Sequence, residues 1–227
     1  MRRLILFDID GTLVRGTAAR KAFQIGLEAA YGTAGAIDTY DFSGKTDPQI
    51  ARELLTGAGI EAARVDAGLA SLWSRYLAEL EKRLPNEPMR VLPGVSALLD
   101  ALDARGDAAL GLVTGNVADG ARLKLGSVGL FERFRVGGFG SDHELRNHLP
   151  GIAIARAREA WGVDFRRADV WVVGDTPLDV ACGQHEGVRT LAVATGRHGA
   201  AELAACGPDA VAEDLSDLDG VLATLLS

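Results

Sequence analysis

The chain has 227 residues, of which 48% are apolar and 24% are charged, and its formal net charge at pH 7 is −7. These values are typical of a soluble globular protein with one large domain, or with one domain that carries a smaller insertion. An acidic chain gains no long-range attraction for nucleic-acid backbones or anionic membranes, so we expect neither as a partner. The two cysteines, Cys182 and Cys206, form no disulfide framework, which favours a reducing, cytoplasmic location.

The start of the chain resembles a signal peptide only briefly. Two arginines precede the apolar run at residues 4–7, and Asp8 then ends that run before it reaches the length of a secretory signal. Later stretches are too short or too polar to span a bilayer. We therefore expect no secretion signal and no membrane span, and nothing in the sequence indicates an oligomeric state.

Four apolar runs predict buried strands, and helical patterns lie between them. The strands are expected at residues 4–7, 109–113, 170–173 and 189–194, and the helices at 95–104, 117–128, 152–161, 177–185 and, at the end of the chain, 215–225. Strands that alternate with helices in this way imply right-handed crossovers and a parallel sheet. The sequence therefore predicts an α/β core.

Residues 15–88 interrupt this alternation. They contain helical patterns at 17–31, 48–56 and 62–84 and no strong strand. Two segments suited to hinges flank them, residues 14–16 and residues 85–88, the second with a proline at each end. We therefore predict a helical cap domain of residues 15–88, inserted into a core domain of residues 1–14 and 89–227.

Three of the predicted strands end in residues that suit chemistry on a phosphate. They are Asp8 and Asp10 after the first strand, Thr114, Gly115 and Asn116 after the second, and Asp175 and Asp179 after the third. In an open parallel sheet, ligands bind beyond the carboxyl ends of the strands. Carboxylates gathered there repel one another, and a divalent cation such as Mg²⁺ relieves that repulsion. Asp8 and Asp175 could bind the cation, and Asp179 could orient a bound water.

Asp8 and Asp10 are two positions apart and share one face where the chain is still extended. Gly11 then allows the chain to turn away. Two carboxylates can thus stand near one reacting atom. One can act as the nucleophile, while the other protonates the leaving oxygen and later deprotonates water.

The order of these motifs resembles the haloacid dehalogenase superfamily, in its phosphatase branch with a helical cap of the C1 type, as in phosphoglycolate phosphatases and beta-phosphoglucomutases. The motifs are DIDGT at residues 8–12, the threonine at 114 and GDTPLD at residues 174–179. The resemblance implies a Rossmann-like, three-layer core with an inserted all-helical cap. It also implies that Asp8 is the nucleophile and a Mg²⁺ ligand, and that Asp10 is the general acid/base, whose backbone carbonyl also binds the metal. Thr114 and the Gly115 amide would bind the phosphate, with Asn116 beside them. Asp175 would be a further metal ligand, with Asp179 behind it.

The superfamily normally has a lysine between the second and fourth motifs, and this chain departs from that pattern. Arg146 lies in the corresponding region, keeps the positive charge and adds a planar fork that suits phosphate. We therefore expect Arg146 to act as a catalytic residue in place of the lysine. Lys124 is a weaker candidate because it lies within a helical pattern.

A loop in the predicted cap, residues 42–49, resembles the loop with which related caps contact the substrate. Two interpretations of its sequence stand side by side. Lys45 could bind an anionic or hydroxylated leaving group, or Thr46 or Asp47 could simply cap the next helix and leave the lysine in solvent.

Taken together, the residues and the resemblance predict a Mg²⁺-dependent phosphomonoester hydrolase that acts on a small phosphorylated metabolite through an aspartyl-phosphate. A phosphomutase of a sugar phosphate and a non-catalytic phosphate-binding protein on the same fold remain alternatives. A dehalogenase is disfavoured, because that branch needs neither Mg²⁺ nor a second aspartate such as Asp10.

Overall fold

The computed structural model describes residues 3–227 and has a six-stranded parallel sheet at its centre. The strands are β1 (Arg3–Phe7), β4 (Ala108–Thr114), β5 (Val136–Phe139), β6 (Val170–Gly174), β7 (Arg189–Val193) and β8 (Ala210–Ala212), in the spatial order β5-β4-β1-β6-β7-β8. After β1 the chain forms one side of the sheet with β4 and β5, and then crosses over to form the other side with β6, β7 and β8. The ends of β4, β1 and β6 therefore lie side by side. That arrangement is the usual position of a ligand site in an open α/β sheet.

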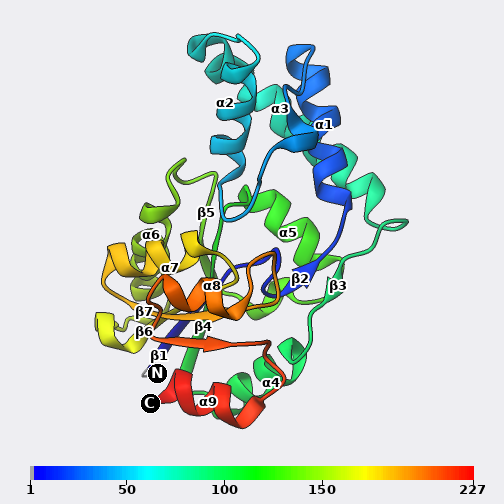
Figure 1. Cartoon of the computed structure of the whole chain (residues 1–227). Helices are drawn as coiled ribbons and strands as arrows, with labels where there is room; N and C mark the ends of the chain where they lie inside the picture. The colour runs from blue at the N-terminus through cyan, green and yellow to red at the C-terminus, as the bar shows by residue number, and fades with distance from the viewer. Residues whose placement is uncertain (1–2) are drawn as a thin grey trace.

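Helices cover both faces of this sheet, so the core has three layers (Figure 1). Leu4 and Leu6 of β1 pack with α6 (Leu149–Trp161) and α7 (Pro177–Glu186) on one face. Ile5 and Phe7 belong to the larger cluster on the other face, which includes α4 (Val95–Arg105), α5 (Ala118–Gly126) and α9 (Leu218–Leu226). All four side chains are fully buried, as expected for a central strand covered on both sides. The predicted α/β core is confirmed.

The segment between β2 (Val14–Arg15) and β3 (Arg90–Val91) gathers at one end of the molecule, above the carboxyl edge of the sheet (Figure 1). It holds α1 (Ala18–Tyr31), the short turn η1 (Ile37–Thr39), α2 (Asp47–Gly57) and α3 (Ala62–Arg83). We call residues 15–88 the cap segment; its standing as a separate domain stays a prediction. Among the described residues, no helix combines the length and the apolar character needed to cross a membrane.

Some elements differ from those expected from the sequence. The strands β5 and β8 and the helix α8 (Ala200–Ala205) were not predicted. Gly137 and Gly138 disguise β5, because glycine is unfavourable in strands. Gly138 is nevertheless required there, since a Cβ at this position would overlap the carbonyl of Leu149 at the start of α6. The helix α6 also begins three residues earlier than predicted, because Pro150 fits the first turn of a helix.

Candidate active site

The ends of two neighbouring strands and the start of the helix that follows the second bring the predicted acidic residues together. Asp8 follows β1, and Asp175 follows the adjacent β6, while Asp179 lies in the first turn of α7. Each of the three side chains offers a carboxylate oxygen, and these oxygens lie within 4.8 Å of one another. The three residues are only 4%, 4% and 2% exposed, respectively. This cluster forms the floor of the site.

The electrostatics of the floor favour a cation. Burial raises the pKa of Asp8 to about 6, although the guanidinium of Arg146 acts in the opposite direction. Burial, together with the charges of Asp8 and Asp179, raises the pKa of Asp175 to about 8. When the three carboxylates are ionised, their negative charge therefore exceeds the positive charge beside them. Clustered carboxylate oxygens are the donors that Mg²⁺ prefers, so the residues present fit such an ion.

Arg146 provides part of the missing positive charge. It lies in the turn η3 (Arg146–His148), directly before α6, and is 5% exposed. Its Nη2 is 2.9 Å from Oδ1 of Asp8 and also pairs with the carboxylate of Asp179. The guanidinium donates further hydrogen bonds to the carbonyls of Gly44, at 3.2 Å, and Val113, at 3.3 Å. The structure thus places Arg146 between the predicted nucleophile and Asp179, with one contact to the cap segment.

Lys124, the weaker candidate because of its helical pattern, also lines the cavity. It is 4% exposed, and its Nζ is 2.7 Å from Oδ2 of Asp10 and 2.6 Å from Oδ1 of Asn116. A residue within α5 can still reach the site, because α5 begins just after the loop that follows β4. The signal was present in the sequence: Lys124 shares the buried face of α5 with Ala121 and Leu125, at helical spacing.

The carboxylate of Asp10 points away from the acidic cluster. Its Oδ2 accepts hydrogen bonds from Lys124 and, at 2.8 Å, from Nδ2 of Asn116, and its side chain is 43% exposed. The chain turns at Gly11, whose φ is +91°, and a Cβ there would overlap the carboxylate of Asp175. The glycine is therefore needed both for its backbone conformation and for space. Asp10 is left facing the open part of the site.

Asp179 has two structural connections at once. Its Oδ2 accepts hydrogen bonds from the backbone N–H of Thr176 at 3.0 Å and from its hydroxyl at 2.6 Å, which completes a capping box at the start of α7. Its Oδ1 pairs with Arg146. In addition, the hydroxyl of Thr12 donates to Oδ1 of Asp175 at 2.8 Å. The floor carboxylates are thus fixed before any ligand arrives.

The cap loop at residues 42–49 contacts the core through its backbone and through the side chains of Thr46 and Asp47. The N–H of Asp47 donates to the carbonyl of Gly115 at 2.7 Å, and a Cβ on Gly115 would overlap the carbonyl of Lys45. Thr46 caps α2 by accepting the N–H of Gln49 at 3.2 Å. The ammonium of Lys45 pairs with Glu53 at 2.7 Å and with the hydroxyl of Tyr40 at 2.9 Å, inside the cap segment. Its proposed contact with substrate stays a prediction.

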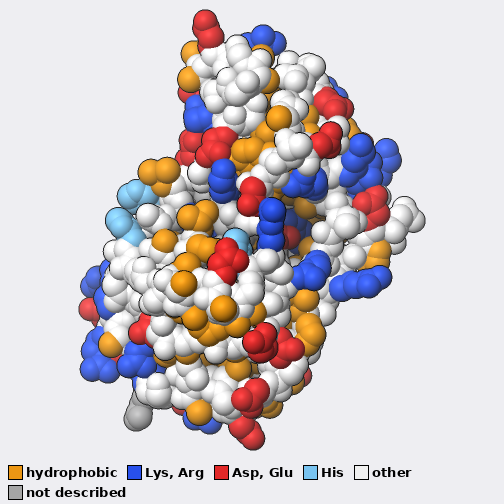
Figure 2. Space-filling model, viewed as in Figure 1, with side chains coloured by type: hydrophobic (Ala, Val, Ile, Leu, Met, Phe, Trp, Pro, Cys, Tyr) orange, Lys and Arg blue, Asp and Glu red, His pale blue; other side chains and the backbone are white. Residues whose placement is uncertain are grey.

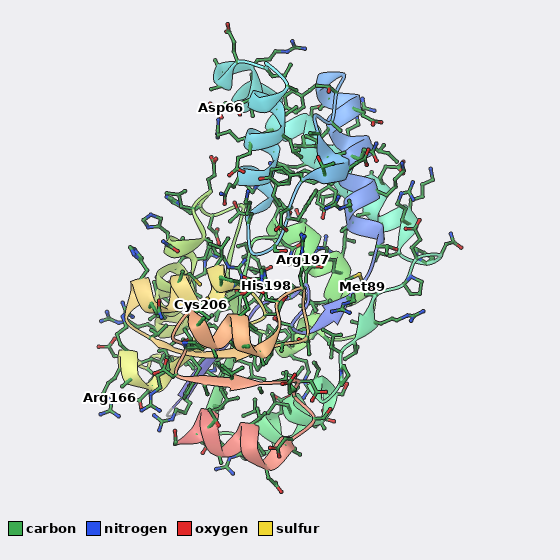
Figure 3. All side chains as sticks on the ribbon, viewed as in Figure 1. Asp66, Met89, Arg166, Arg197, His198 and Cys206 are labelled. Carbon is green, nitrogen blue, oxygen red and sulfur yellow. The ribbon has the colours of Figure 1, made fainter. Side chains whose placement is uncertain are left out.

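A cavity of about 550 Å³ lies between the floor and the cap segment. Figure 2 shows a hollow in this position with Lys and Arg side chains around it. Arg197 lies at the junction of the two parts (Figure 3), and its guanidinium is 3.2 Å from the carboxylate of Asp41 in the cap loop region. Asp8, Asp10, Thr114, Gly115, Asn116, Lys45, Arg146 and Asp175 all line this cavity. The structure therefore brings the predicted catalytic, metal-binding and substrate-binding residues to one hollow, with Asp179 behind them.

Comparison with known families decides the relationship suggested by this geometry. The family described as haloacid dehalogenase-like hydrolase matches residues 5–193, a range that contains every floor residue. The chain belongs to the haloacid dehalogenase-like hydrolases. The resemblance drawn from the three sequence motifs is thereby confirmed, and with it the expectation of an enzyme.

This hydrolase is similar to several characterised and solved proteins. A phosphoglycolate phosphatase of Rhodospirillum rubrum is 30% identical over 234 residues, which cover 96% of this chain and 90% of the relative. The structure of a hydrolase from Pseudomonas syringae has a TM-score of 0.75 at 20% identity and covers 100% of both chains. CbbY from Rhodobacter sphaeroides, solved in complex with phosphate, has a TM-score of 0.72 at 19% identity over 96% of each chain. The likeness thus includes the cap segment as well as the core.

Proposed function

We propose that this hydrolase is a Mg²⁺-dependent phosphatase that removes the phosphoryl group from a small phosphorylated metabolite through an aspartyl-phosphate on Asp8. The observation that carries the proposal is the position of Asp8, a buried carboxylate that lines the cavity, lies 2.9 Å from Arg146 and shares a cluster with Asp175. The similarity to a phosphoglycolate phosphatase supports the reaction class. The absence of a disulfide framework supports a cytoplasmic location.

The proposed domain organisation fits this activity. Residues 15–88 form the cap domain, and residues 1–14 and 89–227 form the core domain. The cap loop covers the carboxyl edge of the sheet through the bond between Asp47 and Gly115 and through the bond between Gly44 and Arg146. Such a cover excludes water while the phosphoryl group moves to Asp8.

Binding of the phosphate is assigned to residues that end β4 and precede α6. The Thr114 hydroxyl and the Gly115 amide hold phosphoryl oxygens, and Arg146 offsets their negative charge. Asp8, Asp175 and the backbone carbonyl of Asp10 would hold Mg²⁺, with Asp179 behind them. When bound, the ion supplies positive charge that lets an ionised carboxylate approach a phosphate dianion.

The proposed reaction has two steps. In the first, an oxygen of Asp8 attacks phosphorus, the ester P–O bond breaks, and Asp10 gives its proton to the leaving oxygen. In the second, Asp10 takes a proton from water, the water oxygen bonds to phosphorus, and the acyl-phosphate bond to Asp8 breaks. Lys124 and Asn116 hold the carboxylate of Asp10 toward the cavity at 2.7 and 2.8 Å. We therefore propose Lys124 as a positioning residue for Asp10.

The test is release of inorganic phosphate from a panel of phosphomonoesters that includes p-nitrophenyl phosphate, measured with Mg²⁺ and with excess chelator. We expect turnover with Mg²⁺ and none with chelator. Conversion of a sugar phosphate into its isomer without phosphate release would favour the phosphomutase alternative. Binding of phosphate with no turnover of any ester, in protein shown to bind Mg²⁺, would favour the non-catalytic alternative and contradict the proposal.

A further inference from the structure

The positive charges that line the cavity fall into two groups. Four have carboxylate partners, since Arg146 pairs with Asp8, Lys124 with Asp10, Lys45 with Glu53 and Arg197 with Asp41. Arg15, at the entrance to the cap segment, and Arg20, on α1, line the same cavity. Within residues 3–227, no carboxylate oxygen lies within 4.0 Å of a side-chain nitrogen of Arg15 or Arg20. Two positive charges therefore face the cavity without a counter-charge.

Arg20 is held in place although it has no acidic partner. Its Nη1 donates to the carbonyl of Ile37 at 2.9 Å, and its Nη2 donates to the carbonyl of Tyr40 at 2.8 Å. Its guanidinium carbon lies 4.2 Å from the centre of the Phe42 ring. A cation fixed by neutral groups keeps its full charge available to a ligand, and its side-chain entropy is already lost before binding. Arg20 is thus pre-organised.

An aromatic row connects Arg20 with the reacting end of the cavity. The ring centres of Phe42 and Phe23 are 6.1 Å apart, and those of Phe23 and Tyr76 are 5.3 Å apart. Tyr76 and Asp10 line the same cavity. We call Tyr76, Phe23, Phe42 and Arg20 the cap wall. A leaving group that starts at Asp10 can lie along this wall with its far end at Arg20.

The hydroxyl of Tyr76 offers a polar group to a ligand at the cap wall. Tyr76 is 1% exposed and lines the cavity, and its hydroxyl forms no hydrogen bond within the part of the chain that the structure describes. The oxygen is not one of the described buried side-chain atoms that lack a partner, so it is open to the cavity. A polar atom of a substrate there can form a hydrogen bond with it.

We propose that the substrate carries a second anionic group on its leaving group, a carboxylate or a second phosphate, and that Arg20 together with Arg15 binds it. This inference rests on the proposed phosphatase function, in which the first anionic group is the phosphate held on the floor. Arginine suits the task because its planar fork can donate two parallel hydrogen bonds to either oxyanion. The cap wall thus selects esters by the charge of the part that leaves.

Binding to an inactive variant tests the inference without turnover. Asp8→Asn, with Mg²⁺ present, is titrated by calorimetry with two matched pairs of ligands. One pair is 2-phosphoglycolate and 2-hydroxyethyl phosphate, which differ in the carboxylate; the other is fructose 1,6-bisphosphate and fructose 6-phosphate, which differ in the second phosphate. We expect the ligand with the second anionic group to bind about 10-fold or more tightly in one of the pairs, and the pair that responds identifies the anion. Equal affinities within both pairs would overturn the inference.

Variants assign the preference to the two arginines. Arg15→Gln and Arg20→Gln, combined in the Asp8→Asn background, should remove the preference and leave the affinity for the ligand with a single anionic group within about two-fold. The control is Arg64→Gln, an exposed arginine on α3 outside the cavity, which should keep the full preference. Since Arg20→Gln also removes two bonds to the cap backbone, Arg15→Gln alone, which should reduce the preference partly, serves as a second variant. A preference that survives the double change would assign the anion to other residues and contradict the proposal.

The experiments distinguish failure of the phosphatase proposal from failure of the second-anion proposal. If the wild-type protein hydrolyses p-nitrophenyl phosphate but the matched ligands bind equally, the second-anion inference is wrong and the phosphatase function stands. If no ester is hydrolysed but the ligand with the second anionic group binds more tightly through Arg15 and Arg20, the phosphatase function is wrong and the chain is a receptor for a phosphate ester that carries a second anionic group.

Discussion

The floor of the cavity and the cap wall carry the same kinds of side chains in opposite arrangements. On the floor, Arg146 and Lys124 are buried and each pairs with a carboxylate at 2.9 Å or less. On the wall, Arg20 is exposed, is held by backbone carbonyls and faces the cavity without an acidic partner. A buried cation that is paired with a carboxylate fixes the geometry of the site, whereas a cation without an acidic partner can select a ligand by its charge. The difference suggests that the floor performs the reaction and the wall chooses the substrate.

This comparison divides the expected effects of substitution into two kinds. A change on the floor should lower the rate for every phosphate ester by a similar factor. A change on the wall should act only on esters whose leaving group reaches it. The predictions below start with the floor residue that bonds to phosphorus and move outward to smaller effects.

The largest effect is expected for Asp8→Asn. An amide cannot act as the nucleophile, so kcat should fall by about 10⁴-fold or more for every ester in the panel. The variant should still fold and bind phosphate, because asparagine has nearly the same shape as aspartate. Steady-state kinetics together with calorimetric binding of a phosphate ester would check this. A kcat within ten-fold of the wild type would show that another group attacks phosphorus.

The next effect is expected for Arg146→Met. The change removes the cation beside Asp8 and Asp179, so kcat should fall by roughly 10²–10³-fold for all esters alike. Two buried carboxylates also lose their partner, which should lower the free energy of unfolding by about 3–5 kcal/mol in the absence of Mg²⁺. Urea unfolding with chelator measures this loss.

Arg146→Lys is the matched control for that prediction. It keeps a positive charge in the place where the superfamily normally has lysine, and should recover much of the rate and of the stability. If Arg146→Met and Arg146→Lys have the same rate, the positive charge of Arg146 does not act on the transferred phosphoryl group.

A smaller and more selective effect is expected for Lys124→Met. Asp10 would lose one of the two groups that orient it, so kcat should fall about 10-fold for alkyl phosphates, whose leaving oxygen needs a proton. The fall should be weaker for p-nitrophenyl phosphate, whose leaving group departs readily as an anion. Lys82→Met is the control, because its side chain is 76% exposed on α3. An equal loss with both esters would argue for a structural role of Lys124.

Removal of the metal should change how stability depends on pH. The pKa of Asp8 is raised to about 6 and that of Asp175 to about 8 in the folded chain, both above the ordinary 3.8. Between pH 4 and 8 the folded state therefore holds more protons than the unfolded state, and its stability falls as pH rises, by at most about 1.4 kcal/mol per pH unit for each extra proton. Added Mg²⁺ should remove this fall, because it stabilises the ionised forms.

Urea unfolding at pH 4, 6 and 8, with chelator or with Mg²⁺, measures the difference. In Asp8→Asn the fall between pH 4 and 6 should become shallower, and the fall caused by Asp175 should move to lower pH, because the charge of Asp8 no longer raises the pKa of Asp175. Metal-free stability that is constant or rises over this range would show that burial and mutual repulsion do not raise the pKa of the floor carboxylates.

The floor could be predicted from the sequence because its residues stand at the ends of apolar runs. Leu4–Phe7 marks a strand, and the carboxyl edge of a parallel sheet then collects whatever follows, here Asp8 and Asp10. The same reasoning predicted the place of Arg146 but not its bond to Asp179, which depends on how η3 packs on α7. The local sequence pattern thus predicts which residues form the floor, whereas their hydrogen-bond and ion-pair partners depend on tertiary packing.

The rest of the site depends on contacts that no short pattern contains. The sequence made Lys124 only a weaker candidate because it lies within a helix, although its spacing on α5 marked a buried face. Arg20 looks like any exposed arginine in the sequence, and only the positions of Phe42 and of the Ile37 carbonyl give it a fixed place in the wall. The strand β5 was hidden by the glycines that its close packing requires.

The central claim is that the carboxylate of Asp8 accepts the phosphoryl group. The most direct measurement is rapid quenching of the enzyme during turnover of a labelled phosphate ester with Mg²⁺, followed by proteolysis and tandem mass spectrometry of the fragment that contains residues 4–15. The account predicts a hydroxylamine-sensitive phosphate on Asp8, absent from Asp8→Asn. Turnover without any phosphorylated protein, or a phosphate found on another residue, would contradict it.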